Sequence, residues 1–287
     1  MNFLIIRRIC TFIPTVFVFF SLMSISCTRK TASSTSDNET LFDTIQVNKT
    51  QSIDYKHSTL NCNLHIAFTY PITCKKTLSL SDLQKMFIEK FFPPQYAELS
   101  PQAVVDSFSS QYIRDFQSIR FNDFFDEDYI LEDENNFLYE LNLENEILYN
   151  QNNFISFIVK NANYEGGAQG ANNIYGYVID LNTGKFLTEE DFAGNNYKKN
   201  LSSIIVQKIA AANGMNDASQ LENNEYYAKE DFVPNDNFTI DDKGITYYFN
   251  ERETADYFLG TTEVFIPYKE IKTFITGDSP ISSLAGL

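Results

Sequence analysis

Histidine side chains, which many nucleophilic and metal sites require, are scarce in this sequence of 287 residues. The two that exist are His57, beside a polar stretch, and His65, inside a run that alternates apolar and polar residues. A serine nucleophile needs an imidazole within hydrogen-bond reach. The chain also has no Gly-x-Ser-x-Gly elbow to expose such a serine. The sequence therefore argues against Ser-His catalysis.

Carboxylates are the other groups that could do chemistry, since paired carboxylates hydrolyse glycosides. The chain carries 38 acidic residues, so such pairs also arise by chance. The segment Asp180-x-Asn182-x-Gly184 resembles the start of a calcium loop. Its glycine spacing and the missing distal glutamate favour a hairpin turn instead. The candidate acid–base residues, all at predicted turns or helix starts, are Glu165, Asp180, Glu189, Glu190 and Asp191.

The N-terminus predicts export. Arg7-Arg8 precede an apolar run from Ile9 to Met23, and Ser24-Ile25-Ser26 lead into Cys27. This order is typical of a secretory signal peptide over residues 1–26. It favours a bacterial lipoprotein with Cys27 as the acylated residue, anchored in the lipid bilayer of the cell envelope. The alternative is a transmembrane anchor, although the run is shorter than the roughly 20 residues of a spanning helix.

Residues 27–49 are rich in Ser, Thr, Asn and Asp, and we expect a flexible tether there. The basic residues that follow Cys27 favour the periplasmic face of the outer membrane over the cell surface. In an oxidising compartment Cys62 and Cys74 could form a disulfide, or they could be two buried free thiols. Two cysteines and two distant histidines lack the ligand spacing of a zinc site. The sequence predicts no metal and no cofactor.

The charge restricts the partners. Net charge is −16 for the whole chain, and removal of Arg7 and Arg8 with the signal peptide makes it −18. Such a surface repels phosphate backbones, which excludes a nucleic-acid partner. It would favour a cationic partner through electrostatic steering. We expect a monomer.

Hydrophobic periodicity predicts two α+β units, with antiparallel sheets and helices packed on one face. The first, residues 50–135, has a strand over Asn63–Ile72 and a helix capped by Ser81 and Gln84. A second helix starts at Ser100-Pro101. The second unit, residues 136–287, has predicted strands at 137–143, 147–149, 154–159, 174–181, 237–240, 245–249 and 262–266, and predicted helices from Thr188, over 201–212 and over 268–275.

Two motifs of the second unit resemble the RsiV-like family known as domain of unknown function 3298. The first is Tyr164-Glu165-Gly166-Gly167-Ala168-Gln169-Gly170, followed by Asp180 and Thr183-Gly184-Lys185. The second is Asn250, Glu253, Tyr257 and Gly260, followed by the strand ending Ile266-Pro267-Tyr268. The resemblance covers Phe137 to Ile275. Residues 63–135 are similar to another domain of unknown function, number 4163, that often precedes it.

The resemblance implies the ectodomain of a lysozyme-sensing anti-sigma factor or the accessory region of a peptidoglycan deacetylase. The family's histidine is Gln169 here, and its proline before the loop tyrosine is Asp256. The deacetylase relatives carry their catalysis in a separate metal domain, which this chain lacks. The glycines Gly166, Gly167 and Gly170 are explained either by a tight bend between strands or by a ligand-contacting loop.

We therefore predict a non-catalytic lipoprotein that recognises a cationic lysozyme-like protein or a peptidoglycan fragment. The alternatives are a peptidoglycan hydrolase or transferase and a purely structural lipoprotein. The predicted binding surface joins the 164–170 turn to the 250–260 loop. Its contacts are Tyr164, Gly166, Gly167, Gln169, Gly170, Glu253 and Tyr257.

Overall fold

The computed structural model describes residues 38–55, 58–74, 78–119, 139–165, 170–194, 197–221, 232–253 and 260–287. All of them belong to one compact unit that spans residues 31–287. The predicted signal peptide and Cys27 lie outside the described residues.

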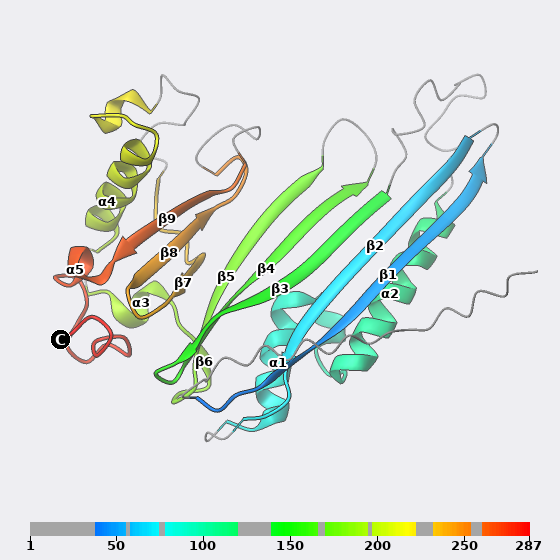
Figure 1. The fold of residues 1–287 in the computed structure, drawn as a ribbon, viewed down its shortest axis with the longest axis horizontal. Helices are drawn as coiled ribbons and strands as arrows, with labels where there is room; N and C mark the ends of the chain where they lie inside the picture. The colour runs from blue at the N-terminus through cyan, green and yellow to red at the C-terminus, as the bar shows by residue number, and fades with distance from the viewer. Residues whose placement is uncertain are drawn as a thin grey trace, which may run out of the picture. The chain divides into compact units, whose positions relative to one another are not determined.

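The larger part of the fold is a six-stranded sheet in the order β1-β2-β3-β4-β5-β6 (Figure 1). Neighbouring strands are antiparallel, except that β2 and β3 run parallel. The α+β class is confirmed, and both sheets are mainly antiparallel as expected, with the β2–β3 pair as a parallel exception. The strands are β1 (Phe42–Tyr55), β2 (Ser58–Pro71), β3 (Tyr139–Gln151), β4 (Phe154–Glu165), β5 (Ala171–Asp180) and β6 (Lys185–Phe186).

The predicted boundary at residue 135 falls inside this sheet. Strand β2 of the first predicted unit pairs with β3 of the second over Cys62–Ala67. A parallel pair requires a crossover connection, and that connection contains two helices. The chain therefore changes from helices to strands at this point without starting a new domain.

Two helices, α1 (Leu80–Phe91) and α2 (Pro101–Ser118), cover one face of the large sheet, with the short 3-10 helix η1 (Pro94–Tyr96) between them. Their aromatic side chains interlock with those of the sheet, and the rings of Phe87 and Phe157 stack at 4.3 Å. The cap of α1 is Ser79, whose hydroxyl accepts a hydrogen bond from the Asp82 N–H. The predicted cap Ser81 is wrong because α1 already begins at Leu80.

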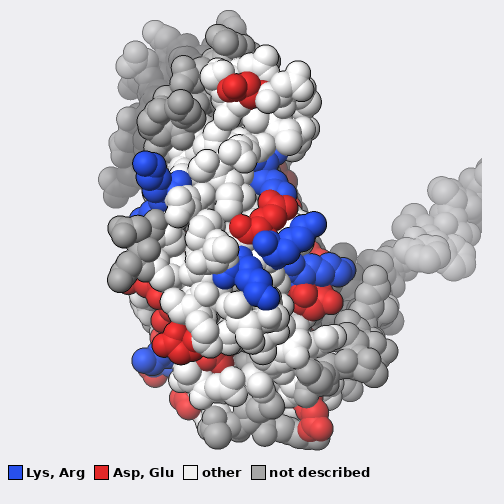
Figure 2. All heavy atoms as spheres, turned by 90° about the vertical axis from the view of Figure 1, so that its left-hand side faces the viewer, with Lys and Arg blue, Asp and Glu red and all other residues white. Residues whose placement is uncertain are grey.

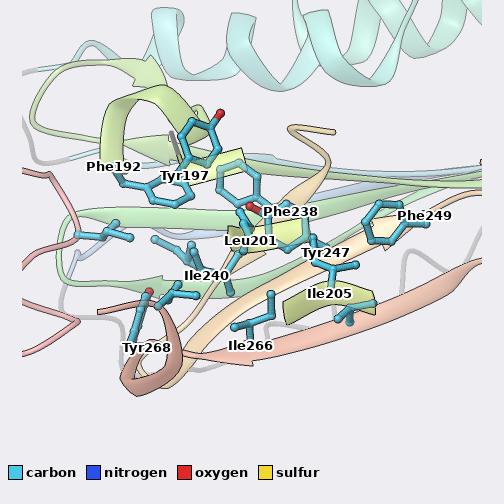
Figure 3. Packing of buried hydrophobic residues seen from close by; sticks show 14 of the residues in the cluster. Phe192, Tyr197, Leu201, Ile205, Phe238, Ile240, Tyr247, Phe249, Ile266 and Tyr268 are labelled. Carbon is cyan, nitrogen blue, oxygen red and sulfur yellow. The ribbon is translucent and has the colours of Figure 1, made fainter. Parts of the chain in front are cut away.

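A three-stranded sheet forms the rest of the fold. It consists of β7 (Phe238–Ile240), β8 (Gly244–Phe249) and β9 (Thr262–Pro267). Aromatic and aliphatic side chains of this sheet pack against α4, as Figure 3 shows for Tyr247 and Leu201. The hairpin turn predicted around Asp241 to Gly244 is confirmed. The helices of this part are α3 (Glu189–Phe192), α4 (Tyr197–Ala212), η4 (Ala218–Gln220) and α5 (Tyr268–Ile271).

Polar side chains join the two sheets. Asn250 accepts a hydrogen bond from the Ile174 N–H (2.7 Å) and donates one to the Ile174 carbonyl (3.1 Å). Asn237 accepts one from the Gly176 N–H (2.6 Å). On β4, the Ser156 hydroxyl both donates to the carbonyl and accepts from the N–H of Ile240. Along the edge of β5 over Ile174 to Gly176, the Asn237 and Asn250 side chains take the place of a partner strand, whereas Ser156 joins β4 to β7.

Gly176 permits this close approach. A Cβ atom built at this position would lie 2.7 Å from the backbone carbonyl carbon and oxygen of Phe238. Real Cβ atoms do not tolerate such a distance to backbone. A glycine is therefore required where β5 meets β7.

One prediction about the N-terminal part is wrong. The tether was expected to extend to Lys49, but the residues from Phe42 onward pair with β2 as a full strand. Their polar side chains belong to the exposed positions of an edge strand, as with Thr44 and Asn48.

Cys62 and Cys74 do not form a disulfide in the structure; both are free. Pro71 lies nine positions after Cys62 along β2, or about 30 Å away. The three residues that follow can recover only about 10 Å. The two Cα atoms thus remain farther apart than the ~7 Å limit of a disulfide.

Candidate functional site

The two loops that the sequence singled out come together in one pocket. It has a volume of about 350 Å³, and we call it the hairpin-end pocket. It lies where the β4–β5 hairpin meets the segment that follows β8. Its lining residues are Asn163, Glu165, Gly170, Ala171, Asn173, Glu251 and Arg252.

Strand alternation determines which side chains enter the pocket. On β4, Ile155, Phe157 and Val159 belong to the core under α1 and α2. Successive side chains of a strand point to opposite faces, so Asn163 and Glu165 lie on that same helix-bearing face. Asn173 joins them from β5, because it pairs with Asn161 in an unbroken antiparallel register. The pocket therefore lies on the helix-bearing face, beyond the residues that the helices cover.

Two backbone features shape the pocket. A Cβ atom at Gly170 would lie 2.6 Å from the Asn163 carbonyl oxygen, so this glycine allows the chain to close tightly over β4. That agrees with the predicted bend for this glycine. On the opposite side, Arg252 has a positive φ of 67°. A non-glycine residue in the left-handed region is uncommon, and such residues cluster at functional sites.

The predicted contact residues separate into three groups. Gly170 lines the pocket, whereas Tyr164 has the opposite strand parity from Asn163 and Glu165 and points to the other face. Glu253 accepts a hydrogen bond from the Asn235 amide (2.8 Å) and thereby holds the loop in place. The predicted contacts Gly166, Gly167, Gln169 and Tyr257 lie outside the described residues, as does Asp256.

Most candidate catalytic carboxylates have structural partners instead. Asp180 accepts hydrogen bonds from the Asn182 N–H and the Thr183 hydroxyl, which stabilises the predicted hairpin turn. Asp191 and Thr188 form the capping box of α3. Among these carboxylates, Glu165 alone lies in the hairpin-end pocket, and it is exposed.

Glu189 is a buried carboxylate in the core beside α4. Its side chain accepts hydrogen bonds from the Tyr197 hydroxyl (2.9 Å) and from the Asp236 N–H (3.0 Å). Burial raises the pKa of Glu189, and these two hydrogen bonds oppose the rise. The Asp236 carboxylate accepts from the Glu189 N–H in return (2.8 Å). The pair fastens α3 to the segment before β7.

Both cysteines in the described part of the chain, Cys62 and Cys74, are free thiols. Burial raises the pKa of the Cys62 thiol to about 11, so it stays protonated at neutral pH. The Cys74 thiol donates to the Leu78 carbonyl (3.4 Å). Within the described ranges, no group of three His, Cys, Asp or Glu side chains is arranged to hold a metal ion.

A second, larger concavity of about 870 Å³ lies at the first turn of α4. Lys198 and Lys199 line it, together with Tyr197, whose ring lies 6.0 Å from the Lys198 ammonium. Apart from Glu190, it contains none of the residues that the sequence motifs indicate.

Sequence reasoning missed most of the pocket's polar groups, namely Asn163, Asn173, Glu251 and Arg252. The available signal was the alternation of Asn161 and Asn163 at the end of an otherwise apolar strand. Amides at the inward positions of a strand indicate that the core has ended and that a polar surface has begun.

The described residues contain no helix long and apolar enough to cross a membrane.

A search of curated proteins finds no significant match. Among solved structures, the chain is similar to a member of the DUF3298 family from Bacteroides fragilis. The TM-score is 0.76 and the identity 24%, covering 87% of this chain and 98% of that one.

A DUF3298 family protein from Pseudomonas aeruginosa is also similar, with a TM-score of 0.55 and 11% identity over 81% of this chain and 94% of that one. At these low sequence identities, the structural similarity to both proteins establishes a shared fold.

The predicted resemblance extended over Phe137 to Ile275. The family model matches a shorter segment, which includes α3, α4 and β7–β9. Residues 187–269 are a DUF3298 domain, described as a protein of unknown function.

Proposed function

We propose that this protein is a cell-envelope lipoprotein whose compact unit binds a polar component of the bacterial wall without transforming it. The observation that carries the proposal is the hairpin-end pocket. It joins the 164–170 turn to the segment after β8, two regions that the sequence indicated independently. Loops held by a rigid sheet are common places for binding sites.

The chemistry of the lining suits a peptidoglycan fragment. Asn163 and Asn173 offer amide donors and acceptors, and Glu165 and Glu251 offer acceptors for hydroxyl groups. Arg252 can pair with a ligand carboxylate through its planar fork of N–H groups. Peptidoglycan presents hydroxyl, acetamido and carboxylate groups close together. A volume of about 350 Å³ is at the lower end of the range for small-molecule sites.

A cationic lysozyme-like protein is the second candidate ligand, and the net charge of −16 favours it. Acidic residues do not dominate every face. The side that carries α4 and α5 shows Lys and Arg side chains interspersed with acidic ones near its centre (Figure 2). A cationic protein would therefore bind elsewhere on the surface.

A hydrolase is the third candidate, because Glu165 and Glu251 line the same pocket. Glycosidases need one carboxylic acid that stays protonated, which usually requires an apolar, enclosed environment. Glu165 is exposed. This exposure favours binding over hydrolysis.

Isothermal titration of the full-length protein in detergent tests the proposal, with soluble muropeptides and a C-type lysozyme as separate ligands. We expect saturable muropeptide binding at physiological salt that Asn173→Ala abolishes. Asn172→Ala is the matched control, since its neighbouring side chain points to the opposite face. Binding of lysozyme alone would select the second candidate. New reducing ends that disappear in Glu165→Gln would select the hydrolase, and no heat with either ligand would refute the proposal.

The lipid anchor has its own test. Cells grown with labelled palmitate should incorporate the label into the wild-type protein but not into Cys27→Ser. A labelled Cys27→Ser variant would show that another residue carries the lipid.

A further inference from the structure

An exposed aromatic ring lies next to the hairpin-end pocket. Tyr175 follows Asn173 by two positions on β5, so both side chains are on the helix-bearing face. Tyr175 is 38% exposed, whereas Tyr177, the next residue on the same face, is half-buried. Its cross-strand partner Val159 is buried beside it on β4.

Tyr175 and the pocket form one continuous strip along β5, and we call residues Ala171, Asn173 and Tyr175 the β5 strip. Same-face residues of a strand lie about 6.7 Å apart, so the strip is about 13 Å long. At its far end, Tyr177 is covered by Lys90 of α1, whose ammonium lies 5.1 Å from the ring centroid. The strip therefore runs from the polar pocket to the ring of Tyr175, and the Lys90 ammonium over Tyr177 lies beyond that aromatic end.

A buried polar group also lies beside the strip, on β4. Asn161, the cross-strand partner of Asn173, has a buried amide oxygen with no hydrogen-bond partner within the described part of the chain. An unmet acceptor is unusual in a folded protein and is often associated with a functional site. It lies in the row of side chains that contains Asn163.

The strand edge beside the strip cannot accept an extended peptide as an additional strand. The N–H and carbonyl of Ile174 are bonded to Asn250, and the N–H of Gly176 is bonded to Asn237. Main-chain pairing is the usual source of affinity for a peptide at a sheet edge. A ligand on the β5 strip must therefore be recognised through side chains.

We infer that the ligand is a glycan chain of at least two amino-sugar units, which lies along the β5 strip. This inference rests on the proposed function and names its ligand class. One sugar occupies the pocket, where Asn163, Asn173 and Glu165 bond its hydroxyl and acetamido groups. The next sugar places the apolar C–H face of its ring on Tyr175.

The experiment measures the affinity of the full-length protein for N-acetylglucosamine and its β-linked di-, tri- and tetramers by titration calorimetry. We expect affinity to rise from the monomer to the trimer and then to level off, because the strip ends at Tyr177. Tyr175→Ala should weaken trimer binding about tenfold and leave monomer binding within about twofold. Tyr175→Phe should bind like the wild type, since stacking requires the ring and not the hydroxyl group.

Two controls separate this inference from the proposed function. Phe265→Ala removes an aromatic ring of similar exposure (43%) on β9, and it should leave all affinities unchanged. Asn173→Ala should weaken binding of every oligomer, the monomer included.

Each outcome decides one of the two claims. If Asn173→Ala abolishes binding but Tyr175→Ala does not change the affinity for the trimer, the inference that Tyr175 contacts the glycan is refuted. The proposal that the hairpin-end pocket binds the ligand then still holds. If no N-acetylglucosamine oligomer binds while muropeptides do, the proposed function holds and a glycan chain is not the ligand. If neither kind of ligand binds, both claims fail.

Discussion

The two faces of the large sheet are covered in different ways. On one face, α1 and α2 are held by apolar packing, with aromatic contacts such as Phe68–Phe91 at 4.7 Å. On the other, the small sheet is joined through amide and hydroxyl side chains that bond directly to backbone, as well as through apolar contacts of Phe154 and Val178.

The two kinds of packing differ in which side-chain substitutions they tolerate. Hydrophobic burial is non-directional, and cores tolerate exchanges that conserve volume. A side chain that substitutes for a partner strand must have the right length and the right donor and acceptor. The stability of the helix layer should therefore depend on the volume of its side chains. The stability of the junction between the two sheets should depend on which side chains are present.

The largest loss of stability should come from truncating a buried side chain between the helices and the large sheet. Phe87 is fully buried and stacks on Phe157. Phe87→Ala should lower the free energy of unfolding by about 3–5 kcal/mol, because it leaves a cavity. Denaturant titration measures this change. Phe87→Leu should cost distinctly less, and an equal cost for both would show that this layer is not governed by volume.

Gly176→Ala should cost about 3 kcal/mol, the upper end of the range for overpacking. The added methyl meets the backbone of Phe238, which cannot move away as a side chain can. The control is Gly277→Ala, since a Cβ there meets no atom within 4 Å. Equal thermal stability of the two variants would contradict the close approach of β5 to β7.

Asn250→Ala should cost about 2 kcal/mol, because the Ile174 N–H loses its hydrogen-bond partner, while the Ile174 carbonyl keeps only the Asn237 amide. Asn250→Asp keeps the size and the acceptor but lacks the donor, so it tests identity apart from volume. If Asn250→Asp is as stable as the wild type, the junction does not require the amide. Chemical denaturation with Asn172→Ala as an exposed control provides the measurement.

The smallest effect should be a dependence on pH. Because the pKa of Glu189 is raised above its ordinary value of 4.5, the folded protein keeps this proton to a higher pH than the unfolded chain does. The stability that this protonated carboxyl contributes is therefore fully present below the pKa of Glu189 in the unfolded chain. It is lost as the pH rises through the pKa of Glu189 in the folded protein.

Glu189→Gln should thus gain stability relative to the wild type as the pH rises from the ordinary glutamate range toward neutrality. Thermal melts across this range provide the measurement. Glu190→Gln, measured in parallel, accounts for the loss of one negative charge from α3. A constant difference between Glu189→Gln and the wild type would show that the buried carboxyl does not titrate in this range.

Much of the fold could be predicted from local patterns. The hairpin turn at Asn182 to Gly184, the α3 cap at Thr188 and the end of α4 before Gly214 follow from short-range chemistry. The prediction of two separate units was wrong because it concerned pairing between distant segments. No local pattern distinguishes a strand that opens a new sheet from one that joins an existing sheet.

The candidate site was predicted in outline. The two loops were identified from motifs, but the orientation of each side chain depends on register. Tyr164 and Glu165 are neighbours in sequence, yet only Glu165 enters the pocket. Arg252 escaped notice because nothing in its immediate sequence indicates a left-handed backbone.

The parallel pairing of β2 with β3 also has a consequence for synthesis and folding. Cys62 lies opposite Tyr139, and Phe87 packs on Phe157, so part of the packing of the N-terminal strands and helices must wait for residues made later. Contacts of such long sequence separation slow folding because the intervening loop must close first. A nascent chain ending near Ile119 could already pack its helices on β1 and β2, but it would expose the apolar surface that later meets β3 and β4, and such a surface favours chaperone binding until these strands arrive.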